Sequence, residues 1–256
     1  MGADFVRIGD VQLEVERRGT GRTVLLLPGE DVLEPDSEAA AALARSFDVV
    51  IPSPPGFGRS SRPDWIDSVD DVSYLYLSLL ERLDLRDVCI IGCSLGGWIA
   101  AEMATKDQSR LAKLVLVAPY GVKFGGAAKR DIADMWTLSP RTVMELKWCD
   151  PATGQRDIAT MSDEQLAIIA RNLESFARFC WEPYMHNPKL RHRLERIAVP
   201  TLLVWGEKDG IVSSDYGRSY ANLIPRAEFE LIAGAAHYPH LEQPGHFMRR
   251  VGAFLR

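Results

Sequence analysis

The chain has 256 residues, of which 46% are hydrophobic and 25% charged, an ordinary composition for a globular protein. Its net charge of −5 comes from interspersed acids and bases, so it lacks the basic stripe of a nucleic-acid-binding protein and has no attraction to acidic membranes. The first residues carry no secretory signal, the apolar runs are too short to span a bilayer, and the four cysteines show no CxxC spacing. We therefore expect a cytoplasmic protein with neither nucleic acid nor membrane as a partner.

The N-terminal part of the chain predicts a hairpin and then buried strands. Alternating apolar residues indicate antiparallel strands within 6–16. The run at 23–27 is entirely apolar or β-branched, which is typical of a strand buried on both faces of a parallel sheet. A helix with Ser37 as a candidate cap is predicted at 37–45, and a further strand at 49–51.

The next segment alternates helices with buried strands. Ser68 or Asp70 is available as the N-cap of the first of these helices. Strands that alternate with helices predict βαβ units, and therefore a twisted parallel sheet with helices on both faces. The elements predicted in order are a helix at 69–83, a strand at 88–91, a helix at 96–104 and a strand at 114–118.

The alternation stops at about residue 121. The segment 121–197 contains no buried strand, and its tryptophans and methionines lie in helix-like surroundings. A helical insertion between two parts of one core, 1–120 and 198–256, is the simplest interpretation. The alternation then resumes with a strand at 201–205, a helix at 215–223, a strand at 228–232 and a closing helix at 244–255.

Ser94 lies in a motif whose surroundings indicate a nucleophile. Gly92-Cys93-Ser94-Leu95-Gly96 matches G-x-S-x-G, follows a buried strand directly and precedes a helix. Such a turn is strained, and strand and helix approach closely, so the residues two before and two after the serine have to be small. The amide of Leu95 would point from the helix start toward a developing negative charge.

A serine hydroxyl needs a base to remove its proton, and His237 is the best candidate. Of the five histidines, only His237 and His240 come just after a predicted strand end, in a loop that could overhang Ser94. His237 follows Gly234-Ala235-Ala236 directly, and His240 is the alternative.

Asp209 is the candidate acid that holds the histidine in one tautomer. It follows the strand at 201–205, so serine, acid and base all lie at the carboxyl ends of parallel strands, where open α/β sheets place their sites. Glu207 is an alternative acid in the same turn.

The chain resembles the α/β-hydrolase superfamily over essentially its whole length, and the chain order serine, aspartate, histidine is the order of that family. Its nearest resemblance is to small carboxylesterases and carbon–carbon bond hydrolases that carry a cap, which the family inserts where 121–197 lies. The motifs that carry the resemblance are Gly92-Cys93-Ser94-Leu95-Gly96-Gly97, Pro55-Gly56-Phe57-Gly58-Arg59-Ser60, Trp205-Gly206-Glu207-Lys208-Asp209, and Gly234-Ala235-Ala236-His237 with Glu242-Gln243-Pro244.

The loop that supplies the second oxyanion donor departs from the family pattern. The family usually has His-Gly-x there, whereas this chain has Pro28-Gly29-Glu30, so the amide of Glu30 takes the oxyanion position beside that of Leu95. Two carboxylates, Glu30 and Asp31, are unexpected next to a developing negative charge. We expect them to face solvent. The alternatives are that they bind a polar or cationic part of the substrate, or pair with a cap arginine such as Arg171 or Arg178.

The resemblance implies a serine hydrolase that cleaves a carboxylic ester or related acyl bond of a small, partly hydrophobic substrate, without cofactor or metal. The open alternatives are a carbon–carbon bond hydrolase of a diketone-type substrate, an acyltransferase, and a non-catalytic small-molecule receptor. Carbon–carbon bond hydrolases typically carry tryptophan where this chain has Tyr238. The candidate substrate contacts are Cys93, Trp136, Trp148, Trp181 and Tyr238.

Overall fold

One mixed sheet of eight strands organises the chain. The computed structural model describes residues 4–30, 38–126 and 129–256. The strand order across the sheet is β1-β2-β4-β3-β5-β6-β7-β8. The strands are β1 (Asp4–Ile8), β2 (Val11–Arg18), β3 (Thr23–Leu27), β4 (Asp48–Pro52), β5 (Val88–Cys93), β6 (Leu111–Val117), β7 (Thr201–Gly206) and β8 (Ala227–Ile232).

The strands β1 and β2 form the predicted hairpin, and β2 continues antiparallel onto β4. All other neighbouring strands are parallel. Parallel strands have to be covered on both faces, and β3, β5 and β7 are accordingly built almost entirely of buried apolar residues. Their carboxyl ends meet at one edge of the sheet.

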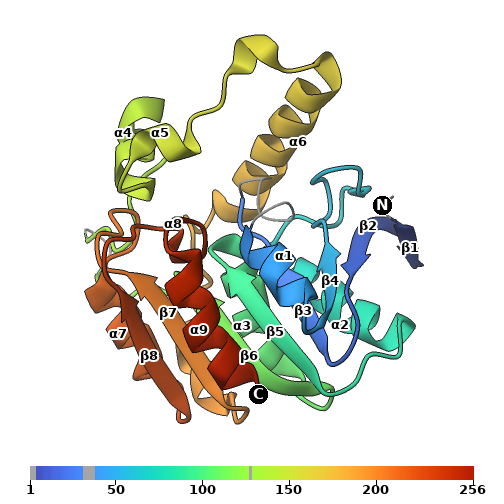
Figure 1. Ribbon diagram of the computed structural model, residues 1–256. Helices are drawn as coiled ribbons and strands as arrows, with labels where there is room; N and C mark the ends of the chain where they lie inside the picture. The colour runs from blue at the N-terminus through green and yellow to red at the C-terminus, as the bar shows by residue number, and fades with distance from the viewer. Residues whose placement is uncertain (1–3, 31–37, 127–128) are drawn as a thin grey trace.

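Helices cover both faces of the sheet. The sheet therefore separates two apolar clusters, one on each face. One face carries α2 (Val69–Arg82), α3 (Leu95–Lys106) and α7 (Ser214–Ala221), which contribute to the larger cluster. The other face carries α1 (Glu38–Ala44) and α9 (Pro244–Leu255), which lie side by side over the smaller cluster (Figure 1). Ser68 caps α2 by accepting a hydrogen bond from the amide of Asp71.

The segment between β6 and β7 is helical. Three α-helices lie at the same end of the sheet as the short helix α8 (Pro239–Glu242) (Figure 1). The longest begins with a capping box, in which Ser162 and Gln165 satisfy each other's backbone N–H groups. The elements of this segment are α4 (Pro140–Lys147), α5 (Pro151–Gly154), α6 (Asp163–Cys180) and the 3-10 helices η1 (Ile158–Thr160), η2 (Leu190–His192) and η3 (Leu194–Arg196).

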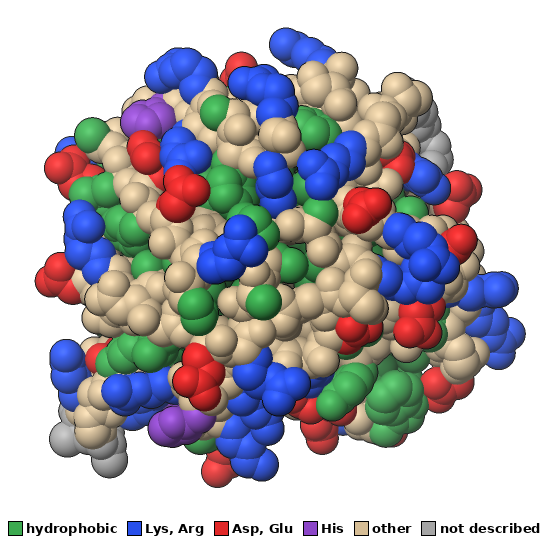
Figure 2. All heavy atoms as spheres, turned by 90° about the horizontal axis from the view of Figure 1, so that it is seen from below, with side chains coloured by type: hydrophobic (Ala, Val, Ile, Leu, Met, Phe, Trp, Pro, Cys, Tyr) green, Lys and Arg blue, Asp and Glu red, His purple; other side chains and the backbone are tan. Residues whose placement is uncertain are grey.

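The predicted fold class is confirmed, with one local difference. The closing helix is preceded by the separate helix α8, because Gln243 leaves the helical backbone conformation between them. Ser37 lies outside the described residues. On the face shown in Figure 2, acidic and basic side chains are interspersed, as the composition suggested. No helix in the described part of the chain is long and apolar enough to cross a bilayer.

Candidate active site

Ser94 lies in a strained turn between β5 and α3. Its backbone has φ 50° and ψ −112°, a left-handed conformation that is costly for a residue with a side chain. Its amide donates to the carbonyl of Val117 at 2.8 Å, and its own carbonyl accepts from Trp98 at 3.1 Å. The turn is thus fixed from the neighbouring strand and from the first turn of the helix.

Glycines let α3 approach the sheet at this turn. A Cβ at Gly96 would lie 2.1 Å from the carbonyl oxygen of Leu27, and one at Gly92 would lie 2.4 Å from the carbonyl oxygen of Gly96. Both contacts would be with backbone atoms, which cannot move aside by a change of side-chain rotamer. The loop after β3 therefore lies against the start of α3, which brings Glu30 next to Ser94.

The structure brings the three predicted residues together in one buried chain of hydrogen bonds. Ser94 Oγ lies 2.8 Å from His237 Nε2, and His237 Nδ1 lies 2.8 Å from Asp209 Oδ2. Ser94 and His237 are each 1% exposed. The second oxygen of Asp209 accepts from the amides of Ile211 and Val212, which fixes the carboxylate toward the histidine.

The loops that carry the acid and the base are bonded to each other. The amide of Glu207 donates to Ile232 and the amide of Lys208 donates to Ala235. Glu207, the alternative acid, accepts only a long bond of 3.5 Å from Gly234 among the described contacts. His240, the alternative base, lies in α8 and packs its ring against Phe247 and Tyr238 rather than on Ser94.

The expectation that Glu30 faces solvent is wrong. Its side chain is buried and bonded to Ser94, because Ser94 Oγ donates to its Oε2 at 2.8 Å. Its ionic partner is Lys147, whose Nζ lies 2.6 Å from Oε1. Neither arginine predicted as a partner takes that place, since Arg171 donates to backbone carbonyls at Gly58 and Ser60, and Arg178 donates to that of Asp64. Asp31 lies outside the described residues.

Two tyrosines complete the surroundings of Glu30. Tyr120 and Tyr238 donate to Oε1 at 3.0 and 3.3 Å. Burial and the adjacent Glu30 carboxylate raise the pKa of Tyr120 well above its usual value, so it keeps its proton as a donor. Burial would raise the pKa of Glu30, but Lys147, His237 and a hydrogen bond from its own N–H lower it to about 2. Glu30 is therefore an anion beside Ser94.

Lys147 reaches the site because the end of α4 is bonded to the loops of the acid and the base. The amide of His237 donates to the carbonyl of Lys147, and the amide of Gly210 donates to that of Leu146, each at 3.0 Å. Just after α4, the amide of Cys149 donates to the carboxylate of Glu242 at 2.7 Å. The same carboxylate accepts from the amide of Ala236, also at 2.7 Å. The segment between β6 and β7 thus contributes a charged residue to the site through backbone contacts.

Sequence reasoning missed Lys147 and Tyr120. Tyr120 stacks on the ring of His237, with centroids 5.3 Å apart, and its hydroxyl lies 3.0 Å from Nε2. It comes soon after β6, at the same edge of the sheet as Ser94, and that position was the available signal. Lys147 had no such signal, because it lies in the insertion far from any predicted strand end.

Two of the five predicted substrate contacts lie around Glu30, and the other three have different surroundings. Tyr238 bonds to Glu30, and Trp148 packs on Tyr238 with ring centroids 4.8 Å apart. Cys93 is not a surface contact, because it is buried in the cluster beneath α1 and α9. Trp136 packs on Phe176, Tyr184 and Trp181, and Trp181 is 59% exposed.

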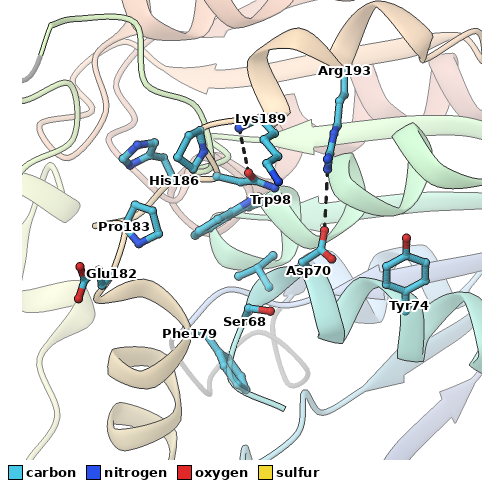
Figure 3. Close-up of a pocket in the computed structure, with 13 residues that line it drawn as sticks. Ser68, Asp70, Tyr74, Trp98, Phe179, Glu182, Pro183, His186, Lys189 and Arg193 are labelled. Atoms are coloured by element: carbon cyan, nitrogen blue, oxygen red, sulfur yellow. Dashed lines mark hydrogen bonds and ion pairs between the residues drawn. The ribbon is translucent and has the colours of Figure 1, made fainter. Parts of the chain in front are cut away.

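Four cavities in the described part of the chain are lined by residues other than Ser94, Asp209 and His237. One of about 330 Å³ lies between the start of α2 and the segment 182–193, with Trp98 and Phe179 in its wall (Figure 3). Trp98 belongs to α3 but points away from the elbow, toward Glu102. In this structure the nucleophile is closed off from these cavities.

The family is decided by a match to residues 24–251. That segment, which makes up most of the chain, matches the model of the alpha/beta hydrolase family. The chain belongs to the alpha/beta hydrolase family. The match includes the strand before the elbow, the whole inserted segment and the loops of Asp209 and His237.

Curated relatives of this hydrolase differ in length and in name. It is 29% identical over 84% of its length to the biotin biosynthesis bifunctional protein BioHC of Teredinibacter turnerae, but spans only 40% of that longer protein. It is 26% identical over 93% of its length to the 2-hydroxymuconate semialdehyde hydrolase of Pseudomonas putida and spans 88% of it. Among solved structures, a thermophilic esterase from Thermogutta terrifontis has a TM-score of 0.74, with 23% identity over 99% of this chain and 98% of that one. The last likeness shows the fold alone.

Proposed function

We propose that this alpha/beta hydrolase cleaves a carboxylic ester, or a related acyl bond, of a small and partly hydrophobic substrate. The observation that carries the proposal is the buried relay in which Ser94 Oγ, His237 and Asp209 follow one another at 2.8 Å per step. The strained elbow and the helix start behind it supply the setting in which a serine acts as a nucleophile.

In the proposed reaction Ser94 attacks the carbonyl carbon while His237 takes its proton. The N–H groups of Leu95 and Glu30 hold the oxyanion of the tetrahedral intermediate. His237 then protonates the leaving alkoxide, and afterwards takes a proton from the water that hydrolyses the acyl-enzyme. Asp209 accepts the Nδ1 hydrogen bond and keeps the ring in one orientation.

The inserted segment 121–197 acts in this proposal as a cap that selects the substrate. The support is that α4 ends against the base loop, with Lys147 at the nucleophile and Trp148 on Tyr238. Aromatic side chains at this boundary provide an apolar surface for an acyl or alcohol group.

A carbon–carbon bond hydrolase is the second candidate, favoured by the relative that is named 2-hydroxymuconate semialdehyde hydrolase. A screen of p-nitrophenyl esters of graded chain length beside a vinylogous 1,5-diketone separates the two. Turnover of esters alone supports the first proposal, and preferential cleavage of the diketone supports the second.

The test of the nucleophile is Ser94→Ala. We expect kcat to fall by about 10³-fold or more, because the three side chains act as a unit. Circular dichroism should show an unchanged fold. A fluorophosphonate should label the wild type at Ser94, and labelling that persists in the alanine variant would refute the assignment.

A further inference from the structure

The Glu30 carboxylate is enclosed by hydrogen-bond donors from four separate parts of the chain. Oε2 accepts from Ser94 at 2.8 Å, and Oε1 accepts from Lys147 at 2.6 Å, Tyr120 at 3.0 Å and Tyr238 at 3.3 Å. A carboxylate has about four acceptor directions, so this one is saturated. The arrangement is that of a carboxylate ligand in a binding site.

The side chains around the carboxylate are positioned without Glu30. The backbone of Lys147 is held by the amide of His237 at 3.0 Å. Tyr120 stacks on the ring of His237, and Tyr238 packs on Trp148. If the Glu30 side chain leaves, these donors still surround a space of carboxylate size that contains a buried ammonium group.

Glu30 in this position opposes the proposed reaction. When the imidazole is neutral and its Nδ1–H points to Asp209, Nε2 is an acceptor, and Ser94 and Tyr120 are the hydroxyl donors within reach. Both hydroxyls also lie within reach of the Glu30 oxygens. The two hydroxyl protons are therefore shared among three acceptors, which are His237 Nε2 and the two carboxylate oxygens of Glu30. An anion in contact with Ser94 also repels the oxyanion that forms there.

We propose that Ser94, Tyr120, Lys147 and Tyr238 form a carboxylate-binding subsite, here named the acid subsite, which Glu30 fills in this structure and which a free carboxylate competes for. The inference rests on the proposed function in taking Ser94 as the nucleophile. The natural competitor is the carboxylic acid that ester hydrolysis releases beside Ser94. Departure of Glu30 also frees its own N–H for the oxyanion and exposes the Lys147 ammonium and the Tyr120 hydroxyl to it.

The first test is the rate at which a fluorophosphonate labels Ser94. Glu30→Ala should be labelled on the order of 10-fold faster than the wild type or more, because groups aimed at a developing oxyanion act at least at that scale. Acetate should then slow the labelling of this variant and have little effect on the wild type, whose subsite is already filled. Equal sodium chloride controls for ionic strength.

The matched control is Glu102→Gln. Glu102 is also a fully buried carboxylate near a lysine, with Lys106 at 3.4 Å, but its contacts lie on the side of α3 that faces away from the elbow. Its variant loses a buried charge without touching the acid subsite, so its labelling rate should equal that of the wild type. Glu30→Gln, which keeps the side-chain volume, carries the same comparison if Glu30→Ala does not fold.

The second test does not depend on Ser94 as a nucleophile. Acetate should raise the Tm of the Glu30 variant, since a ligand that binds only the folded state stabilises it. The double variant Glu30→Ala with Lys147→Met should lose that response. Slower or unchanged labelling, or no effect of acetate on either readout, would overturn the acid subsite. If neither the wild type nor Glu30→Ala is labelled at all while acetate still stabilises Glu30→Ala, the proposed function is overturned and the subsite stays supported.

Discussion

Asp209 holds three hydrogen bonds through its two carboxylate oxygens, two from backbone N–H groups and one from His237. Asparagine keeps the shape of the side chain but presents an N–H group on one side, which disturbs either the backbone bonds or the histidine tautomer. Asp209→Asn should therefore leave the protein folded and lower kcat by about 10²- to 10⁴-fold. Glu207→Gln, changed in the same turn, should cost far less. If the two variants rank in the opposite order in a steady-state assay, the acid has been misassigned.

The ion pair between Glu30 and Lys147 predicts how stability depends on pH. The folded-state pKa of Glu30 is lowered from its ordinary 4.5 to about 2, so the carboxylate contributes stability that is fully present above pH 4.5. That contribution is lost as the pH falls toward 2, where the folded protein also takes up the proton. The difference in unfolding free energy between the wild type and Glu30→Gln, measured in urea, should be constant from pH 5 to 8 and shrink below pH 4.5. A difference that grows on acidification would contradict the pairing.

Single residues were predictable where they lie in a local pattern and unpredictable where they do not. Ser94 follows from five consecutive residues, and Asp209 and His237 follow from their places after strands. Glu30 lies next to Ser94, but the orientation of its side chain depends on Lys147, which is 117 residues away in the sequence. No periodicity or spacing reports a contact of that kind.

At the scale of elements, the sheet was predictable because each buried strand is a continuous apolar run. The bounds of β3 and α9 agree with the sequence pattern, and α2 is capped by Ser68, one of the two predicted candidates. The separate helix α8 was not predicted, because Glu242-Gln243-Pro244 also fits the start of a single helix. The difference depends on the backbone of Gln243, which no residue type at that position dictates.

Gly206 shows how an element end positions the base. A Cβ at this last residue of β7 would lie 1.9 Å from the carbonyl oxygen of Ala236, directly before His237. Gly206→Ala should cost about 1–3 kcal/mol of stability. It should also lower kcat on the order of 10²-fold, since displacement of a reacting group by about 1 Å has that effect.

The control for this variant is Gly252→Ala. Gly252 lies in α9 and a Cβ there has no neighbour within 4 Å. Alanine in a helix interior should stabilise the protein by up to about 1 kcal/mol and leave kcat unchanged. Thermal unfolding and initial rates measured on both variants distinguish displacement of the base loop from a general effect of adding a methyl group.

At the scale of the whole molecule, the segment between β6 and β7 has two parts. One part lies against the loops that carry Asp209 and His237, and the other part lies away from these loops. Trp148 belongs to the first part, and Trp181 is largely exposed in the second. If the segment selects the substrate, Trp148→Ala should change KM or the preferred ester length by about 1–3 kcal/mol, whereas Trp181→Ala should change neither. A short acetate ester should respond least. Equal losses on every ester would show that Trp148 supports the fold rather than selectivity.

The backbone hydrogen bonds from Gly210 and His237 to the end of α4 also constrain how such a chain diversifies. A backbone carbonyl can accept these hydrogen bonds whatever side chain its residue carries, so they do not restrict the residue type at position 146. They do restrict the length of the chain through 146–149, because a change of length would displace the carbonyls. Homologous chains should therefore gather insertions and deletions between residues 150 and 162, beyond the end of α4. An engineer who replaces the segment between β6 and β7 of this hydrolase should keep residues 140–149 and splice after Asp150. A splice at residue 121 would remove the acceptor of the buried His237 N–H group and the acceptor of the Gly210 N–H group.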